Sequence, residues 1–223
     1  MKIQKLMIFV GPPGAGKTAR AYILKKKIEL NYHLKVKTIR TGAHVKMVKL
    51  FIEPTIKFAF SSRKPNLIKN LMKRLLLFYL YLYEISLMMD LLKLKLLNSL
   101  NRADCIIEHE GLFYKWLVDL FFLLLTYDIS NHEKNYVAKK ATLFLLHLLY
   151  YLAQRYTIIS YAIFPRFDVV LNRLKIREGS KISYTYYRSW CLTFRFITNI
   201  INICKIVPPI TIYVLNDECL VQS

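Results

Sequence analysis

The sequence predicts an α/β fold, in which the strands of a sheet alternate with helices. The chain has 223 residues, 55% of them apolar, which is enough to build the core of one such domain over residues 1–223. Short apolar runs of strand length alternate along the chain with longer segments of helical length, as is typical of βαβ units. A glycine-rich stretch between the first apolar run and the first helical segment carries the most specific signal.

The glycine-rich stretch follows the apolar run 6–10 and leads into a lysine-rich segment. Glycines allow backbone N–H groups to converge on a phosphate, and the N-terminus of the following helix attracts the same anion. The lysine of such a stretch contacts the β and γ phosphates, and the hydroxyl next to it is a ligand of Mg²⁺. We interpret the stretch as an ATP phosphate-binding loop that consists of Gly11, Pro12, Pro13, Gly14, Ala15, Gly16, Lys17 and Thr18.

The chain is strongly basic, with 34 Lys and Arg residues against 14 Asp and Glu residues and a formal charge of +20. A bound Mg-triphosphate neutralises only a few of these charges, so the others are solvated or meet another polyanion. Nucleic acid or an acidic membrane surface is one interpretation. Compositional bias is the other, and it is favoured because the basic residues are spread along the chain and not gathered in a tail.

No segment predicts a membrane span or a signal peptide. The longest apolar stretch, 141–154, is bracketed by Lys140 and Arg155, and it is shorter than the about 20 residues that cross a bilayer. The first apolar run leads into the glycine loop and not into a cleavage site. We expect reduced thiols in a cytoplasm, because metal-ligand spacing is missing among Cys105, Cys191, Cys204 and Cys219.

The first half of the chain predicts several helical segments and one strand after the loop. A helix is expected over about 17–31, and the alternation of apolar and basic residues at 34–40 predicts a strand with one solvated face. Pro54 divides the basic segment 44–60 into two short helical pieces. The leucine-rich segment 66–100 predicts one long helix or a bent pair, largely buried because most of its circumference is apolar.

Two carboxylates follow the next short apolar strand, which begins near residue 103. In a phosphate-loop protein, an acid at the end of a neighbouring strand lies beside the loop, where it binds Mg²⁺ or takes a proton from the acceptor. We assign Glu108 and Glu110 as a pair, with Glu108 the first choice for the metal and Glu110 for the acceptor. The alternative is a pair of exposed carboxylates at a strand end.

The second half of the chain continues the alternation and carries a pair of arginines. Arg173 and Arg177 are four residues apart, on one helix face, within a candidate lid at about 165–185. Two guanidinium groups there would clamp the transferring phosphoryl group, although a solvated basic helix face has the same pattern. The expected helices cover 112–127, about 133–154 and about 183–205, and the expected strands cover 157–164 and 210–215.

Taken together, these motifs resemble the nucleoside and nucleotide kinases of the phosphate-loop superfamily, thymidylate kinase most of all. The resemblance rests on the glycine loop, the acid at Glu108, and an Arg-x-x-x-Arg sequence after Pro165. It implies that Arg40, just after the second strand, holds the acceptor phosphate. The sequence departs from the family where Glu-His-Glu-Gly replaces an Asp-Arg pair and where Asp168 is displaced from Pro165.

The resemblance implies a three-layer α/β/α fold with a five-stranded parallel sheet in the order 2-3-1-4-5. It also implies Mg-ATP-dependent phosphoryl transfer to a nucleotide or similar small phosphate acceptor, with a homodimer as one assembly. Two other functions stay open. The basic charge and the Gly-Pro-Pro-Gly-x-Gly-Lys-Thr motif also fit a nucleic-acid-associated ATPase. The Glu-His-Glu-Gly sequence also fits a nucleotide-binding interaction protein without transfer activity.

Overall fold

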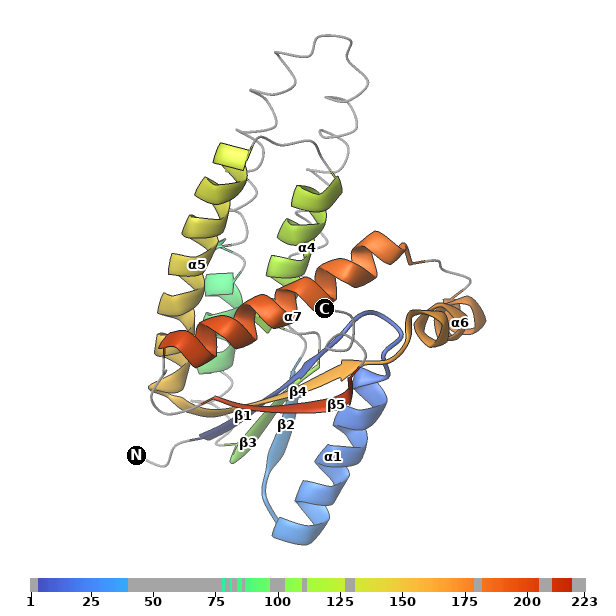
Figure 1. The fold of residues 1–223 in the computed structure, drawn as a ribbon. Coiled ribbons are helices and arrows are strands. Elements are labelled where there is room, and N and C mark those ends of the chain that lie inside the picture. The colour runs from blue at the N-terminus through green and yellow to red at the C-terminus, as the bar shows by residue number, and fades with distance from the viewer. Residues whose placement is uncertain are drawn as a thin grey trace.

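The strands and helices alternate as the sequence predicts (Figure 1). The computed structural model describes residues 4–39, 78, 81, 84–85, 87–96, 103–109, 112–126, 131–178, 182–204 and 210–217. The segment 44–60, with its two expected helical pieces, lies outside these residues.

The centre of the fold is a parallel sheet. Its five strands are hydrogen-bonded in the order β2-β3-β1-β4-β5, as expected from the resemblance. The central strand β1 is buried on both faces over its last five residues, which explains why it reads as a continuous apolar run. The strands are β1 (Gln4–Val10), β2 (Val36–Ile39), β3 (Cys105–Glu108), β4 (Tyr156–Phe164) and β5 (Thr211–Asp217).

Helices cover both faces of this sheet and make the fold three-layered. Of the labelled helices in Figure 1, α1 lies on one face, α4, α5 and α7 lie on the other, and α6 lies beyond the end of β4. This arrangement confirms the α/β/α fold. The helices are α1 (Lys17–Tyr32), α4 (Leu112–Thr126), α5 (Asn131–Ala153), α6 (Phe167–Glu178) and α7 (Tyr184–Cys204).

Strand β1 divides its side chains between two hydrophobic cores. Leu6 and Ile8 belong to the larger core together with residues of α4, α5 and α7. Met7 and Phe9 belong to the smaller core, which includes Ala21 of α1. Because successive side chains of a strand point to opposite faces, one apolar run supplies both cores.

The second strand is shorter than the sequence predicts, because it begins at Val36 and not at residue 34. The residues before it bond to the chain that enters β3. The amide of Lys35 donates to the Asp104 carboxylate (3.0 Å), and the Asp104 amide donates to the Lys35 carbonyl (2.9 Å).

The described part of segment 66–100 is helical, but the expectation that it is largely buried is wrong. One face of this helix contributes Leu87, Leu91 and Leu94 to the larger core. The opposite face of this helix carries an apolar stripe whose residues are 47 to 58% exposed. The stripe consists of Phe78, Tyr81, Ile85, Met88, Met89 and Leu92.

Among the helices of the described residues, none is long and apolar enough to cross a bilayer. Cys105 and Cys204 carry free thiols, as expected, and burial raises the pKa of Cys105 to about 11, which keeps it protonated and unreactive near neutral pH. Cys191 is disulfide-bonded, so the expectation that all the cysteines are reduced is wrong at this position.

Candidate active site

The glycine-rich loop is a tight turn between the end of β1 and the start of α1. A Cβ on Gly11 would overlap the carbonyl oxygen of Ile163 in β4, so only glycine allows this close approach. Within the turn, the Ala15 amide donates to the Pro12 carbonyl (3.2 Å), and Gly14 has a left-handed φ of 79°. The loop is therefore shaped by β1 and β4, the two strands that meet at this edge.

The N-terminus of α1 opens directly onto the loop. The Arg20 amide donates to the Gly16 carbonyl (3.1 Å), which is the first helical hydrogen bond. No described side chain caps this end at Gly16, and the first turn carries no acidic residue. The first amides and the positive end of the helix dipole therefore face the loop without a carboxylate of the helix to neutralise them, an arrangement that suits an anion.

Lys17, the first residue of α1, folds back over the loop. Its Nζ donates to the carbonyl oxygens of Gly11 (2.7 Å) and Pro12 (2.9 Å). The same Nζ lies 5.3 Å from the ring centroid of Trp190 on α7. A full positive charge is therefore held at the loop, where the sequence predicts contact with phosphates.

Glu108 ends the strand next to β1. It pairs in register with Ile8 of β1 and with Ile39 of β2, and its side chain is 0% exposed. The alternative of an exposed carboxylate at a strand end is therefore wrong for Glu108. The other two residues predicted near this edge, Glu110 and Arg40, lie outside the described residues.

The residues at this edge offer hard oxygen ligands of the kind that Mg²⁺ prefers. Thr18 follows Lys17 in the first turn of α1 and is exposed, and Glu108 supplies a carboxylate in the adjoining strand. The described residues contain no group of three or more His, Cys, Asp or Glu side chains that could hold a metal. Mg²⁺ does not require one, because it takes one or two protein oxygens together with phosphates and water.

Helix α6 packs directly on the loop. A Cβ on Gly14 would lie 3.0 Å from Cγ of Leu174 and 3.1 Å from the carbonyl oxygen of Val170. Between these two contacts, Arg173 reaches the start of α1, because its Nη1 lies 3.8 Å from where a Cβ on Gly16 would be. The structure thus brings Arg173 to the loop, whereas the side chain of Arg177 lies outside the described part of α6.

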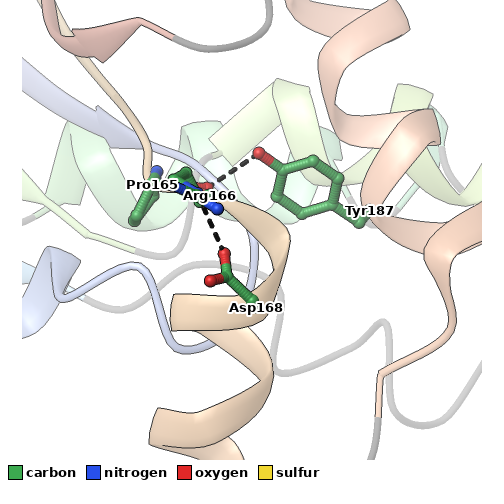
Figure 2. Close-up of polar contacts among 4 residues, drawn as sticks. All are labelled: Pro165, Arg166, Asp168 and Tyr187. Carbon is green, nitrogen blue, oxygen red and sulfur yellow. Dashed lines mark hydrogen bonds and ion pairs between the residues drawn. The ribbon is translucent and has the colours of Figure 1, made fainter.

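Aromatic contacts fix the start of α6 against α7. The hydroxyl of Tyr187 donates to the Pro165 carbonyl (2.8 Å; Figure 2). The Phe167 ring contacts the Tyr187 ring, with centroids 5.5 Å apart. The nearby ion pair between Arg166 and Asp168 (3.3 Å) is exposed and contributes little. Buried aromatic packing, and not this ion pair, therefore sets the position of α6 over the loop.

Trp190 and Tyr187 are site residues that sequence reasoning missed. They lie on α7 and reach the loop and the start of α6 through contacts between distant parts of the chain. No motif marks them, and aromatic residues of an amphipathic helix are ordinary core residues. The only available signal was the presence of a tryptophan, a residue that occurs twice in the chain.

No model of a known protein family matches the sequence, and no curated protein matches it significantly. The solved structures that match this chain include two kinases. Deoxyadenosine kinase from M. mycoides with bound dATP has a TM-score of 0.54 and 14% identity, over 96% of this chain and 91% of that chain. Thymidylate kinase from Candida albicans has a TM-score of 0.46 and 13% identity, over 95% of this chain and 84% of that chain.

The similarity to deoxyadenosine kinase extends over nearly the whole of both chains. At this level of identity it concerns the backbone arrangement. The chain therefore has a three-layer α/β/α fold similar to that of this kinase, with its glycine-rich loop at the carboxyl end of the central strand.

Proposed function

We propose that this chain is a phosphotransferase that moves the γ-phosphoryl group of Mg-ATP to a nucleotide or a similar small phosphate acceptor. The observation that carries the proposal is the loop 11–18, in which a lysine charge, a helix N-terminus and a glycine turn converge. The fold of a deoxyadenosine kinase with bound dATP supports a nucleotide as ligand.

Different groups of the loop bind different parts of the triphosphate. The amides of the loop and of the first turn of α1 bind phosphate oxygens, and Lys17 turns its Nζ from the carbonyls toward the β and γ phosphates. Thr18 and Glu108 would hold Mg²⁺, which would supply positive charge against the triphosphate. Catalysis of this kind consists mostly of positioning and charge stabilisation.

The remaining residues act on the acceptor and on the transferring group. We assign Arg40 to the acceptor phosphate and Glu110 to acceptor contact. Arg173, with Arg177 one turn later, approaches from the candidate lid 165–185 and stabilises the charge that develops during transfer. All of these residues belong to one domain that spans 1–223.

Labelled ATP with a panel of acceptors tests this function. We expect the label to pass from the γ position to a nucleoside monophosphate or a deoxynucleoside, with thymidylate and deoxyadenosine as the first candidates. ATP binding without transfer to any acceptor would indicate a nucleotide-binding interaction protein. ATP hydrolysis that DNA or RNA stimulates in a salt-sensitive manner would indicate a nucleic-acid-associated ATPase. The charge of +20 suggests this alternative.

We also propose that the chain forms a homodimer through its apolar stripe. The exposed side chains of the stripe recur every three or four residues, which places them on one helix face and gives them the spacing of a helix-helix seam. A face of this kind fits the same face of a second copy related by a two-fold axis.

The area and charge of the stripe suit a second copy. An aromatic side chain buries 150 to 250 Å², so six half-exposed large side chains offer about 600 Å² per copy, near the lower limit of about 1,200 Å² in total for stable interfaces. Two copies with a charge of +20 repel each other, and association is easiest where the contact face is uncharged. The six side chains of the stripe carry no charge themselves, and the ammonium of Lys140 lies at its border, 6.0 Å from the centroid of the Tyr81 ring.

Leu92→Glu is expected to convert the dimer to a monomer, because it places a carboxylate within the seam. Light scattering after size exclusion measures the mass. Ile23→Glu, at a similarly exposed position on α1, is the control and leaves the dimer intact. A wild-type chain that is monomeric at tens of micromolar would contradict the proposed dimer and would leave the proposed reaction untouched.

A further inference from the structure

The ring of Trp190 presents an aromatic face to the Lys17 ammonium. Nζ lies 5.3 Å from the ring centroid, within the about 6 Å at which a cation is attracted to an aromatic face. Trp190 is only 2% exposed, so water screens this contact weakly. Its helix, α7, joins the loop to the larger core.

Packing alone does not explain a tryptophan at this position. The indole Nε1–H of Trp190 is buried without a hydrogen-bond acceptor among the described residues. A buried donor without a partner costs stability, and phenylalanine would fill most of the same space without that cost. What tryptophan supplies in exchange is the strongest attraction that an aromatic face has for a cation.

The ring is also held in place by its surroundings. Trp190 belongs to the larger core together with Phe194 and Ile197, one and two turns further along α7. The ring of Phe194 contacts that of Phe164 at the end of β4, with centroids 5.2 Å apart. One turn earlier, Tyr187 bonds to the carbonyl of Pro165. Trp190 is thus fixed relative to β4 and α6, the two elements that contact the loop.

We propose that Trp190 is a positioning residue for Lys17. The lysine side chain is long and loses rotamer freedom when it binds phosphate, so holding its ammonium over the loop beforehand reduces the cost of binding. A ring face attracts the charge without replacing the hydrogen bonds to Gly11 and Pro12. The same contact therefore persists while the N–H groups exchange these carbonyls for phosphate oxygens. This inference rests on the proposed function.

Fluorescence tests the contact without any nucleotide. The chain has two tryptophans, so Trp116→Phe leaves Trp190 as the single emitter. An ammonium close to an indole quenches it, and we expect the emission of this protein to rise when Lys17→Met is added. Lys26→Met is the matched control, because Lys26 of α1 lies over the ring of Tyr22 (4.9 Å). Equal emission with and without Lys17 would overturn the inference.

Nucleotide affinity tests the consequence of the contact. We expect Trp190→Leu to raise the Kd for Mg-ATP about threefold to tenfold, and Trp190→Phe, which keeps a ring, to raise it less. Thermal unfolding of the same proteins separates this role from packing. Trp190→Phe is expected to unfold at or above the wild-type temperature, because it removes the buried donor that lacks an acceptor.

The outcomes separate the inference from the proposed function. If the wild-type chain binds Mg-ATP and the folded Trp190→Leu protein binds it equally well, the positioning role is overturned and the phosphotransferase proposal stands. If the wild-type chain binds no Mg-ATP, the proposed function is overturned, whatever the emission of Trp190.

Discussion

Lys17→Ala is expected to abolish Mg-ATP binding and phosphoryl transfer while the chain stays folded. The helix dipole at the N-terminus of α1 is worth only about 0.3 to 1 kcal/mol, which is too little to hold a triphosphate without the lysine charge. The loss of one preorganised group of this kind lowers turnover by about 10² to 10³. Calorimetric titration with Mg-ATP measures the binding, and a thermal melt checks the fold.

Lys25→Ala is the matched control for this variant. Lys25 lies on the same helix, two turns from Lys17, and forms a partly exposed ion pair with Glu29 (3.7 Å) that contributes little to stability. We expect its affinity for Mg-ATP to remain near that of the wild type. Retention of both binding and turnover in Lys17→Ala would remove the nucleotide interpretation of the loop.

Arg173→Ala is expected to lower kcat by about tenfold to a hundredfold and to change the Kd for Mg-ATP much less. The reason is geometric. Arg173 lies beside Gly16 because Val170 and Leu174 pack on Gly14. Under the proposed function, its guanidinium would stabilise the charge that develops on the transferring phosphoryl group. An interaction made only in the transition state affects turnover and not the binding of ATP.

Lys175→Ala provides the comparison for Arg173→Ala, because Lys175 is an exposed cation on the same helix. Its removal changes the charge of α6 by the same amount and is expected to leave kcat within about twofold, as long-range charges at an exposed site are screened. An equal loss of kcat in both variants would show that Arg173 acts only through the overall positive charge of α6 and not through a specific contact.

The sheet was predictable because its signals are local. Strand β4 was expected at 157–164 and occupies Tyr156–Phe164, since an apolar run that ends at a proline is readable without knowledge of its neighbours. The glycine loop is predictable for the same reason, because strand, turn and helix follow each other directly. The strand order came from the resemblance, and the register of β1 against β3 and β4 agrees with it.

The contacts between distant segments were not predictable from local patterns. The packing of α6 on Gly14 and the position of Trp190 against Lys17 depend on how α6 and α7 fold back over the loop. The exposed stripe was misjudged because an apolar circumference does not tell which face meets the core. Arg40 and Glu110 stay predictions.

The most direct test of the phosphate loop is to follow its backbone amides by NMR while Mg-ATP is added. We expect the largest shifts at Gly14, Gly16, Lys17 and Thr18, and we expect adenosine at the same concentration to leave these amides nearly unchanged, because it lacks phosphates. Saturation with Mg-ATP that shifts amides elsewhere and leaves these four in place would contradict the account.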